Sequence, residues 1–353
     1  MKTILFILFL GFTLLGFSQN TLIPDPNFEQ ALIDLGYDTA PIDGQVLTAN
    51  ISGVTSLNVS NNNITDLTGI EDFTALATLY CYLNPLTSLD VSNNTALATL
   101  NCRSNQLTSL DVSNNTALTS LLCYQNQLTS LDVSNNTALN YLYCGTNQLT
   151  SLDVSNNTAL IELGCGNGHL TNIDVSGATA LEYLAVPYNQ LTSLDVSGAT
   201  ALFRLVSDNN LLTSLDFRNG NNTNVSQLNL RSNPNLTCIF VDDADYSNIY
   251  WINVLSYCPN STFVENEAEC EALSIGDNAL ELDVFIYPNP TDNYLFIEGN
   301  KNPVSISIYN LLGAEVISKS NTDKINVGEL SNGVYIIRIS DGLGQTYRKF
   351  IKN

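Results

Sequence analysis

Histidine and basic residues are scarce in this chain of 353 residues. His169 is the only histidine, and 12 lysines and arginines stand against 34 aspartates and glutamates, giving a formal net charge of −22. Nucleic acids and anionic membranes are bound through basic patches, so both are disfavoured as partners. The sequence also lacks a nucleophile motif, a phosphate-binding loop and a cluster of metal-ligating residues. We therefore expect no enzyme, no metal and no other cofactor.

Long apolar runs are also missing, except for one at the amino terminus. Lys2 precedes a nearly continuous apolar stretch from Ile4 to Phe17, and the small residues Gly16 and Ser18 suit a cleavage site. This arrangement is typical of a secretory signal peptide, which we assign to residues 1–18. A membrane anchor is the alternative, but the run is shorter than the ~20 residues that a spanning helix needs. Export of the mature chain is predicted, without a membrane-spanning segment.

What the sequence has in abundance is one repeated segment. Leu97 to Gln106 returns almost unchanged at Leu118 and Leu139, and weaker copies follow at the same interval. A fixed period of this length indicates a protein built of stacked units, here called rungs. One leucine marks each rung: Leu57, Leu79, Leu100, Leu121, Leu142, Leu163, Leu184, Leu205 and Leu228. Nine rungs are predicted, and their spacing changes only at the two ends, where terminal repeats are usually atypical.

Within a rung, Leu100 and Cys102 alternate with Asn101 and Arg103. A period of two predicts a short strand with the leucine and the cysteine directed inward. An asparagine follows each strand, where its side chain can bind backbone groups at the turn. It recurs as Asn62, Asn84, Asn105, Asn126, Asn147, Asn189, Asn210 and Asn233. Gly168 replaces it in one rung, where we expect a local irregularity, and the adjacent His169 is interpreted as a tolerated substitution for glutamine.

The recurring pattern Leu-x-x-Leu-x-Cys-x-x-Asn-x-Leu resembles the short, internalin-like leucine-rich repeats of bacteria. The resemblance implies a mainly β solenoid of nine short parallel strands. The boundaries that we predict are an N-terminal helical cap at 19–50, repeats at 51–237, a C-terminal cap at 238–270 and a linker at 271–283. The N-terminal cap would contain a helix from Asn27 to Leu35, capped by Asp25 and ended by Gly36. Trp251 and its aromatic neighbours would form the C-terminal cap over the last rung.

The cysteines divide into a column in the repeats and three in the C-terminal cap. The column consists of Cys81, Cys102, Cys123, Cys144 and Cys165. We interpret these as buried free thiols, because the inward positions offer no histidine or carboxylate to complete a metal site. In the cap, a disulfide between Cys238 and Cys270 is predicted, although Cys258 could replace either partner.

Seven aspartates form a second regular row, at Asp90, Asp111, Asp132, Asp153, Asp174, Asp195 and Asp216. Stacked neighbours would repel each other by about 0.8 kcal/mol in water, whereas a hydrogen bond from a backbone amide contributes roughly 1.5–3 kcal/mol. We therefore expect each carboxylate to accept hydrogen bonds from the residues that follow it. Calcium between rungs is the alternative.

Residues 284–353 differ from the repeats, since most of the basic residues lie here. Alternating runs such as Ser305–Tyr309 and Val334–Ile339, separated by turn residues, predict six or seven short strands in a β-sandwich. Tyr287-Pro288-Asn289-Pro290, Ile308–Gly313, Leu330–Tyr335 and Arg348–Lys352 together are similar to the type A sorting domain of the type IX secretion system of Bacteroidota. The resemblance implies passage across the outer membrane of a Gram-negative cell by that machinery, to the outer surface or the medium. Gly333, Tyr335, Lys349 and Lys352 match the sorting motif.

The outward residues of the strands vary while the inward frame repeats. Eight of them would share one face and form a ligand-binding surface: Tyr80, Tyr82, Arg103, Leu122, Tyr124, Tyr141, Tyr143 and Tyr183. Tyrosine and arginine are enriched in recognition surfaces, although tyrosine is also common on any sheet surface. The predicted function is adhesion to, or recognition of, a protein or glycan. A passive component of the surface layer is the alternative, and a module that serves a partner enzyme is a third possibility.

Overall fold

The computed structural model describes residues 19–274, 284–298, 305–320, 322–340 and 345–353. The chain divides into two compact units, residues 1–265 and 266–353, and each is described by itself. The predicted signal peptide lies outside the described residues, as do positions 275–283 of the predicted linker. In the part of the chain that the structure describes, no helix has the length and apolar character needed to cross a membrane.

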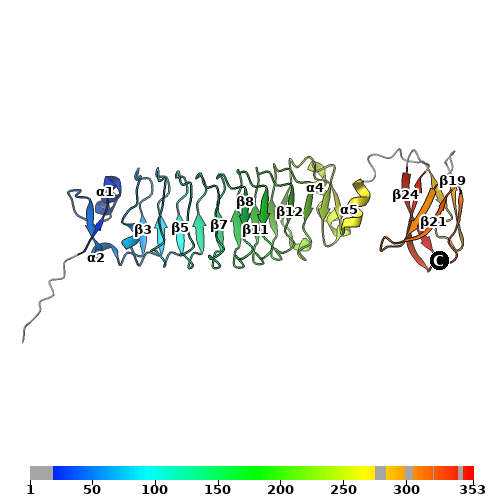
Figure 1. Ribbon diagram of the computed structural model, residues 1–353, viewed down its shortest axis with the longest axis horizontal. Coiled ribbons are helices and arrows are strands. Elements are labelled where there is room, and N and C mark those ends of the chain that lie inside the picture. The colour runs from blue at the N-terminus through cyan, green and yellow to red at the C-terminus, as the bar shows by residue number, and fades with distance from the viewer. Residues whose placement is uncertain (1–18, 275–283, 299–304, 321, 341–344) are drawn as a thin grey trace, which may run out of the picture. The chain divides into compact units, whose positions relative to one another are not determined.

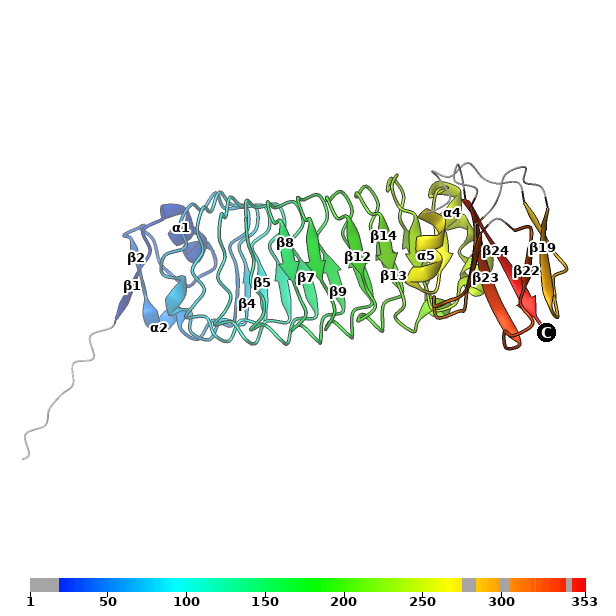
Figure 2. The same cartoon turned by 45° about the vertical axis from the view of Figure 1, so that its right-hand side comes forward.

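The first unit is a leucine-rich-repeat solenoid whose rungs stack in chain order (Figures 1 and 2). One nine-stranded parallel sheet runs along it, which confirms the predicted strands. They are β3 (Ser56–Asn58), β4 (Thr78–Tyr80), β5 (Thr99–Asn101), β6 (Ser120–Leu122), β7 (Tyr141–Tyr143), β9 (Glu162–Gly164), β11 (Tyr183–Ala185), β13 (Arg204–Val206) and β15 (Gln227–Asn229). The marker leucines pair in register, as Leu100 does with Leu121, and all but Leu228 are fully buried. The repeated leucine therefore forms the continuous core of the unit.

The segment that leads from one strand of this sheet to the next also contains a strand in the later rungs. β8 (Ser151–Asp153) pairs with β10 (Asn172–Asp174), and a four-stranded sheet joins the next rungs to the cap. Its strands are β12 (Ser193–Asp195), β14 (Ser214–Asp216), β16 (Cys238–Phe240) and β17 (Thr262–Val264). These strands begin near the point at which the turn that follows the aspartate changes from Asn156-Asn157 in one rung to Gly177-Ala178 in the next. At Gly177 an added Cβ would lie 1.8 Å from the carbonyl oxygen of Ser155, so the glycine lets neighbouring coils approach closely.

The asparagine after each strand binds two rungs at once. Nδ2 of Asn105 donates to the carbonyl oxygens of Cys81 (3.1 Å) and Cys102 (3.0 Å), and its Oδ1 accepts from the amide of Leu86 (3.2 Å). The residue before it, Ser104, has a left-handed backbone with φ of 55°. The strands β7, β9 and β11 remain in register at Gly168, so the predicted local irregularity does not extend to the sheet. It is confined to hydrogen bonds: the side-chain bonds of the asparagine are missing, and the amide of His169 does not form the backbone bond that Gln148 and Gln190 form in their rungs.

The five cysteines of the column are buried and free, which confirms the interpretation of these residues as interior thiols. Burial raises the pKa of Cys102 to about 12, so the thiol stays neutral. In the cap, Cys238 and Cys270 are the disulfide-bonded cysteines, whereas Cys258 is buried with a free thiol.

The N-terminal cap combines a hairpin with short helices. Strands β1 (Asn20–Leu22) and β2 (Gln45–Leu47) are antiparallel, and α1 (Pro26–Asp34) and α2 (Thr48–Ile51) precede the first rung. The 3₁₀ turn η1 (Ile70–Asp72) lies within that rung, between β3 and β4. Helix α1 confirms the predicted capping, because Asp25 accepts hydrogen bonds from the amides of Asn27 and Phe28. The hairpin was not predicted.

The C-terminal cap closes the solenoid with α3 (Ala244–Tyr250) and α4 (Ile252–Tyr257), whereas η2 (Asn222–Asn224) lies in the repeats between β14 and β15. Trp251 is buried and packs edge-to-face against Phe217 and Phe263, with ring centroids 5.6 and 5.9 Å apart. Aromatic burial of this kind covers the apolar end that a last rung would otherwise expose.

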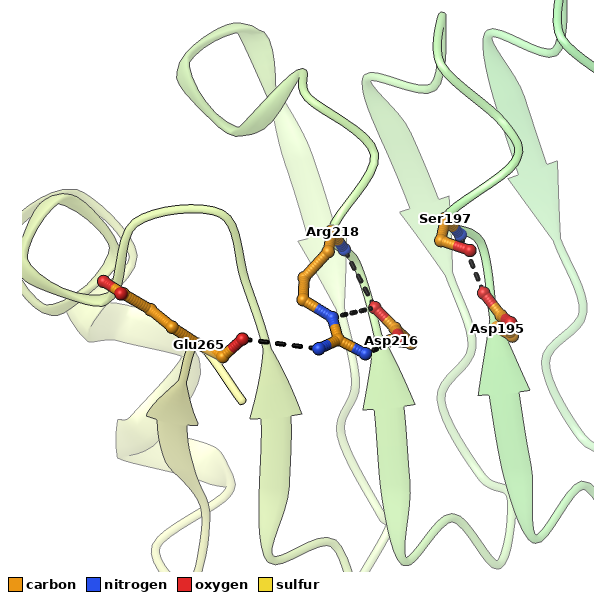
Figure 3. Close-up of polar contacts among 5 residues, drawn as sticks. All are labelled: Asp195, Ser197, Asp216, Arg218 and Glu265. Atoms are coloured by element: carbon orange, nitrogen blue, oxygen red, sulfur yellow. Dashed lines mark hydrogen bonds and ion pairs between the residues drawn. The ribbon is translucent and has the colours of Figure 1, made fainter. Parts of the chain in front are cut away.

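The aspartate row forms the predicted turns. Asp195 accepts a hydrogen bond from the amide of Ser197 at 2.9 Å (Figure 3). The other members likewise accept from the residue two positions on. At the last position of the row Arg218 replaces the serine, forms an ion pair with Asp216 and also donates to the carbonyl oxygen of Glu265 (3.3 Å). No group of three potential metal ligands was found among the described residues.

The second unit contains α5 (Glu267–Ser274), which crosses the boundary predicted at residue 270, and a seven-stranded β-sandwich. One sheet holds β18 (Phe285–Tyr287), β19 (Tyr294–Glu298) and β22 (Lys324–Asn326). The other holds β20 (Ser305–Tyr309), β21 (Glu315–Ser320), β23 (Gly333–Ser340) and β24 (Gln345–Lys352). Both sheets contribute to one apolar core, which confirms the predicted sandwich.

Candidate binding face

The outward side of the nine-stranded sheet carries three parallel rows of side chains, which we call the strand face. The first row stands at the start of each strand and includes Tyr141, Glu162, Tyr183 and Arg204. The second row stands at the end of each strand and includes Tyr80, Asn101, Leu122, Tyr143, Gly164 and Ala185. The third row lies two residues further on and includes Tyr82, Arg103, Tyr124, Gly145, Gly166 and Pro187. All eight residues predicted for the ligand surface belong to these rows.

Arg103 lies between two tyrosines of the third row. Its guanidinium carbon is 4.6 Å from the ring centroid of Tyr82 and 5.5 Å from that of Tyr124. Its Nη1 also donates a hydrogen bond of 2.5 Å to the hydroxyl of Tyr124. Stacking of a cation on aromatic rings, with a hydrogen bond at one edge, fixes all three half-buried side chains in one arrangement.

Tyr143 leans across the neighbouring strand because that strand carries a glycine. A Cβ added at Gly164 would lie 2.6 Å from Cδ1 of the Tyr143 ring, too close for any other residue without a shift of the ring. The hydroxyl of Tyr143 donates a hydrogen bond to the carboxylate of Glu162. Partial burial, this hydrogen bond and the charge of Glu162 together raise the pKa of Tyr143 well above 10. The phenol is therefore a fixed, neutral donor.

The absence of side chains beyond Tyr124 and Tyr143 leaves a hollow of about 490 Å³ in the strand face. Three glycines form its floor: Gly145, Gly164 and Gly166. Its walls are aromatic or apolar, with Tyr124, Tyr143, Tyr183, Leu122 and Pro187, and no charged residue lines it. A concave site with apolar walls and a few polar groups is the usual form of a ligand pocket.

Packing requires two of these glycines as well. A Cβ at Gly145 would lie 2.5 Å from the carbonyl oxygen of Gly166, and a Cβ at Gly166 would lie 2.9 Å from the ring of Pro187. The hollow was not predicted, because Gly168 alone was interpreted and no effect was assigned to the outward glycines. The signal in the sequence was three glycines at outward positions of adjacent rungs, beside tyrosines.

The remaining predicted residues surround this centre. Tyr183 lines the hollow and is covered by Arg204, whose guanidinium carbon is 4.3 Å from the ring centroid. Tyr141 is the most exposed tyrosine of the set, at 41%, and flanks Glu162 in the first row. Tyr80 and Tyr82 do not line the hollow. Both belong to the rung of β4, which is two rungs from Leu122 and three rungs from Tyr143.

The residues of the predicted sorting motif lie on the last two strands of the sandwich. Gly333 pairs with Lys352 and Ile336 with Lys349, across the β23–β24 ladder. Tyr335 is buried, stacks on Phe350 at 5.6 Å and donates its hydroxyl to the carbonyl oxygen of Ser331. Lys352 is buried as well, while Lys349 is exposed.

Comparison with protein families identifies the C-terminal segment. Residues 285–353 match the secretion system C-terminal sorting domain, and residues 138–167 match the LVIVD repeat. Residues 285–353 are therefore a type IX sorting domain, and the chain is exported to the outer cell surface or secreted by that system.

The repeats are similar to those of an internalin. Internalin J of Listeria monocytogenes is 42% identical over 77 residues, which are 22% of this chain and 8% of that protein. An endo-acting ulvan lyase of Formosa agariphila is 36% identical over 85 residues, or 22% of this chain and 16% of the lyase. The chain thus spans less than a fifth of either relative. The solved functional domain of internalin J, described as including a cysteine ladder, is 22% identical with a TM-score of 0.43, over 95% of this chain and 99% of that one.

Proposed function

We propose that this exported protein recognises an external protein or glycan through the strand face of its solenoid, as an adhesion or recognition protein. The hollow beside Tyr124 and Tyr143 carries the proposal. Elsewhere the face is closed by side chains that contact one another, as Tyr82, Arg103 and Tyr124 do. At the hollow the aromatic groups instead surround an open space.

The size of the face supports a macromolecular ligand. Nine strands at a spacing of ~4.8 Å extend the face over about 38 Å, the scale of a protein interface or of an extended glycan. Fixed aromatic side chains bind at a low entropic cost, because little side-chain freedom is lost on contact. Binding rather than catalysis is proposed, since the single histidine, His169, is exposed and the lining of the hollow contains no acid or base.

The test compares the full chain with a double variant, Tyr124→Ala with Tyr143→Ala, on a glycan array and in pull-downs with proteins of the natural surroundings. Tyr250→Ala is the control, because this exposed tyrosine lies in the C-terminal cap, away from the face. The proposal expects a bound ligand that the double variant loses and the control retains. Binding that is absent from all three proteins favours the passive structural component, and binding that is equal in all three would mean that the ligand is bound outside the strand face.

A further inference from the structure

We infer that the hollow of the strand face receives the guanidinium group of an arginine side chain presented by a partner protein. This inference rests on the proposed function of the face and specifies its ligand. It is carried by the way in which the chain places its own arginines, by the open position beside Tyr124, and by the charge of the first unit.

Every arginine of the first unit stacks on an aromatic ring. Besides Arg103 and Arg204, Arg218 lies 4.9 Å from the ring centroid of Phe240, and Arg231 lies 4.9 Å from that of Tyr257. These four are the only basic residues between Lys2 and Lys301. The outer surface of this unit thus accommodates guanidinium groups against rings wherever the chain itself supplies one. Arginine suits such sites because its planar, weakly hydrated cation stacks at a lower desolvation cost than an ammonium group.

The hollow offers two tyrosine rings, as the site of Arg103 does, but the chain places no arginine between them. The third row runs Tyr82, Arg103, Tyr124 and then has no side chain at Gly145 and Gly166. Arg103 occupies one side of Tyr124, and the hollow lies on the other side, facing Tyr143. A guanidinium inserted from outside would therefore meet Tyr124 and Tyr143 as Arg103 meets Tyr82 and Tyr124. Glu162, held by the hydroxyl of Tyr143, supplies negative charge at the edge.

Charge complementarity favours a basic partner over a neutral saccharide. Residues 19–265 contain 22 acidic residues and four arginines, a net charge of −18. A field of this sign accelerates the approach of cationic surfaces and repels anionic ones. A neutral sugar ring could stack on the tyrosines, but it would gain nothing from this charge or from Glu162.

The experiment uses a phage-displayed library of random peptides, selected on the immobilised full chain. We expect the selected peptides to share an arginine at one position. Replacing that arginine by citrulline, which keeps the shape but removes the charge, should weaken binding about tenfold in a calorimetric titration. Raising the salt concentration from 50 to 500 mM should weaken the binding of the arginine peptide and leave the binding of the citrulline peptide nearly unchanged.

Variants of the receptor connect the effect to the hollow. Tyr143→Leu and Glu162→Gln should each reduce the affinity for the arginine peptide about fivefold or more, while Tyr250→Leu leaves it unchanged. Ala185→Arg provides a second variant, because Ala185 lines the hollow and a new arginine there would occupy it. This variant should abolish binding even if Tyr143→Leu fails to fold, which circular dichroism would reveal.

The outcomes separate this inference from the proposed function. Selected peptides without arginine, or equal binding of the citrulline peptide, would overturn the inference. Glycans whose binding requires Tyr124 and Tyr143, in the absence of any arginine peptide, would also overturn it while supporting recognition by the strand face. If neither peptides nor glycans depend on the face, both proposals are wrong.

Discussion

Oδ2 of Asp25 accepts hydrogen bonds of 2.7 Å from both the amide and the hydroxyl of Thr65, 40 residues further along the chain. The other carboxylate oxygen caps helix α1 through the amides of Asn27 and Phe28. One buried carboxylate thus joins the N-terminal cap to the start of the solenoid. The cap protects the open end of the core, so this junction should control the stability of the first rungs.

Asp25→Asn should lower the free energy of unfolding by about 2 to 4 kcal/mol at pH 7, because an amide cannot accept all of these hydrogen bonds. Burial alone would raise the pKa of Asp25, but the hydrogen bonds from Thr65, Phe28 and Asn27 outweigh it and hold the pKa below 3.8. The stabilisation is therefore complete above about pH 5 and is lost as the pH falls through 3.8 to the lowered value.

Urea denaturation of both proteins between pH 2 and 7 measures the difference. Asp34→Asn is the control, since Asp34 is exposed at the end of the same helix. A difference between wild type and Asp25→Asn that stays constant down to pH 2 would show that the carboxylate is not responsible.

The asparagine ladder should contribute more than any exposed polar residue of the rungs. Nδ2 of Asn126 donates to the carbonyl oxygens of Cys102 and Cys123, and its Oδ1 accepts from the amide of Leu107 at 3.0 Å. Asn126→Ala leaves the buried amide of Leu107 without a partner and removes one of two asparagine donors from the carbonyls of Cys102 and Cys123, which keep Asn105 and Asn147. A loss of about 1 to 3 kcal/mol is expected. Asn114→Ala, which removes one exposed hydrogen bond to Ser92, should cost less than 1 kcal/mol. Equal losses in chemical denaturation would contradict this account.

The glycines of the later turns provide a third prediction, with a control inside the same unit. Gly177→Ala places a methyl group where the carbonyl oxygen of Ser155 lies, and a loss of about 3 kcal/mol is expected from the forced separation of two coils. Gly53→Ala meets nothing within 4 Å and should change the stability by less than about 0.5 kcal/mol. The melting temperatures of both variants measure the difference. If Gly177→Ala melts like the wild type, the two coils do not approach each other as closely as described.

Inward positions could be predicted from the sequence, whereas most of the candidate site could not. Leu100 and Cys102 repeat because every rung meets the same neighbours, so their period alone predicts burial and pairing. Asp25 was likewise predicted, because capping depends on local chain geometry. The hollow depends on which side chains of the neighbouring rungs lie beside Gly164. The outward residues do not repeat from rung to rung, so the sequence offers no period from which to predict those neighbours. The lean of Tyr143 across Gly164 is a relation between rungs that only coordinates reveal.

The thiol column predicts a defined count in solution. With five free column cysteines and free Cys258, unfolding without reductant should expose six thiols, and reduction should raise the number to eight. In the folded protein these thiols should react very slowly at pH 8, because all six are buried away from the reagent. Burial also raises the pKa of Cys102 and of Cys258, which keeps these two thiols neutral. Titration with a chromogenic disulfide measures all three states. Fewer than six thiols before reduction would indicate disulfides within the column.

The last prediction concerns the sorting domain, where Asn289 holds the final strand. Its Nδ2 donates to the carbonyl oxygen of Lys349 (3.1 Å), and its Oδ1 accepts from the amide of Ile351 (2.9 Å). Asn289→Ala should therefore loosen β24, which carries the basic end of the predicted sorting motif, by about 1 to 2 kcal/mol. Hydrogen exchange of the β24 amides in the full chain should accelerate about fivefold to thirtyfold, and the exported fraction should fall. Asn332→Ala, at an exposed turn, is the control and should change neither quantity. Faster exchange with normal export would mean that the strand is held for stability alone, and unchanged exchange would mean that the asparagine does not hold it.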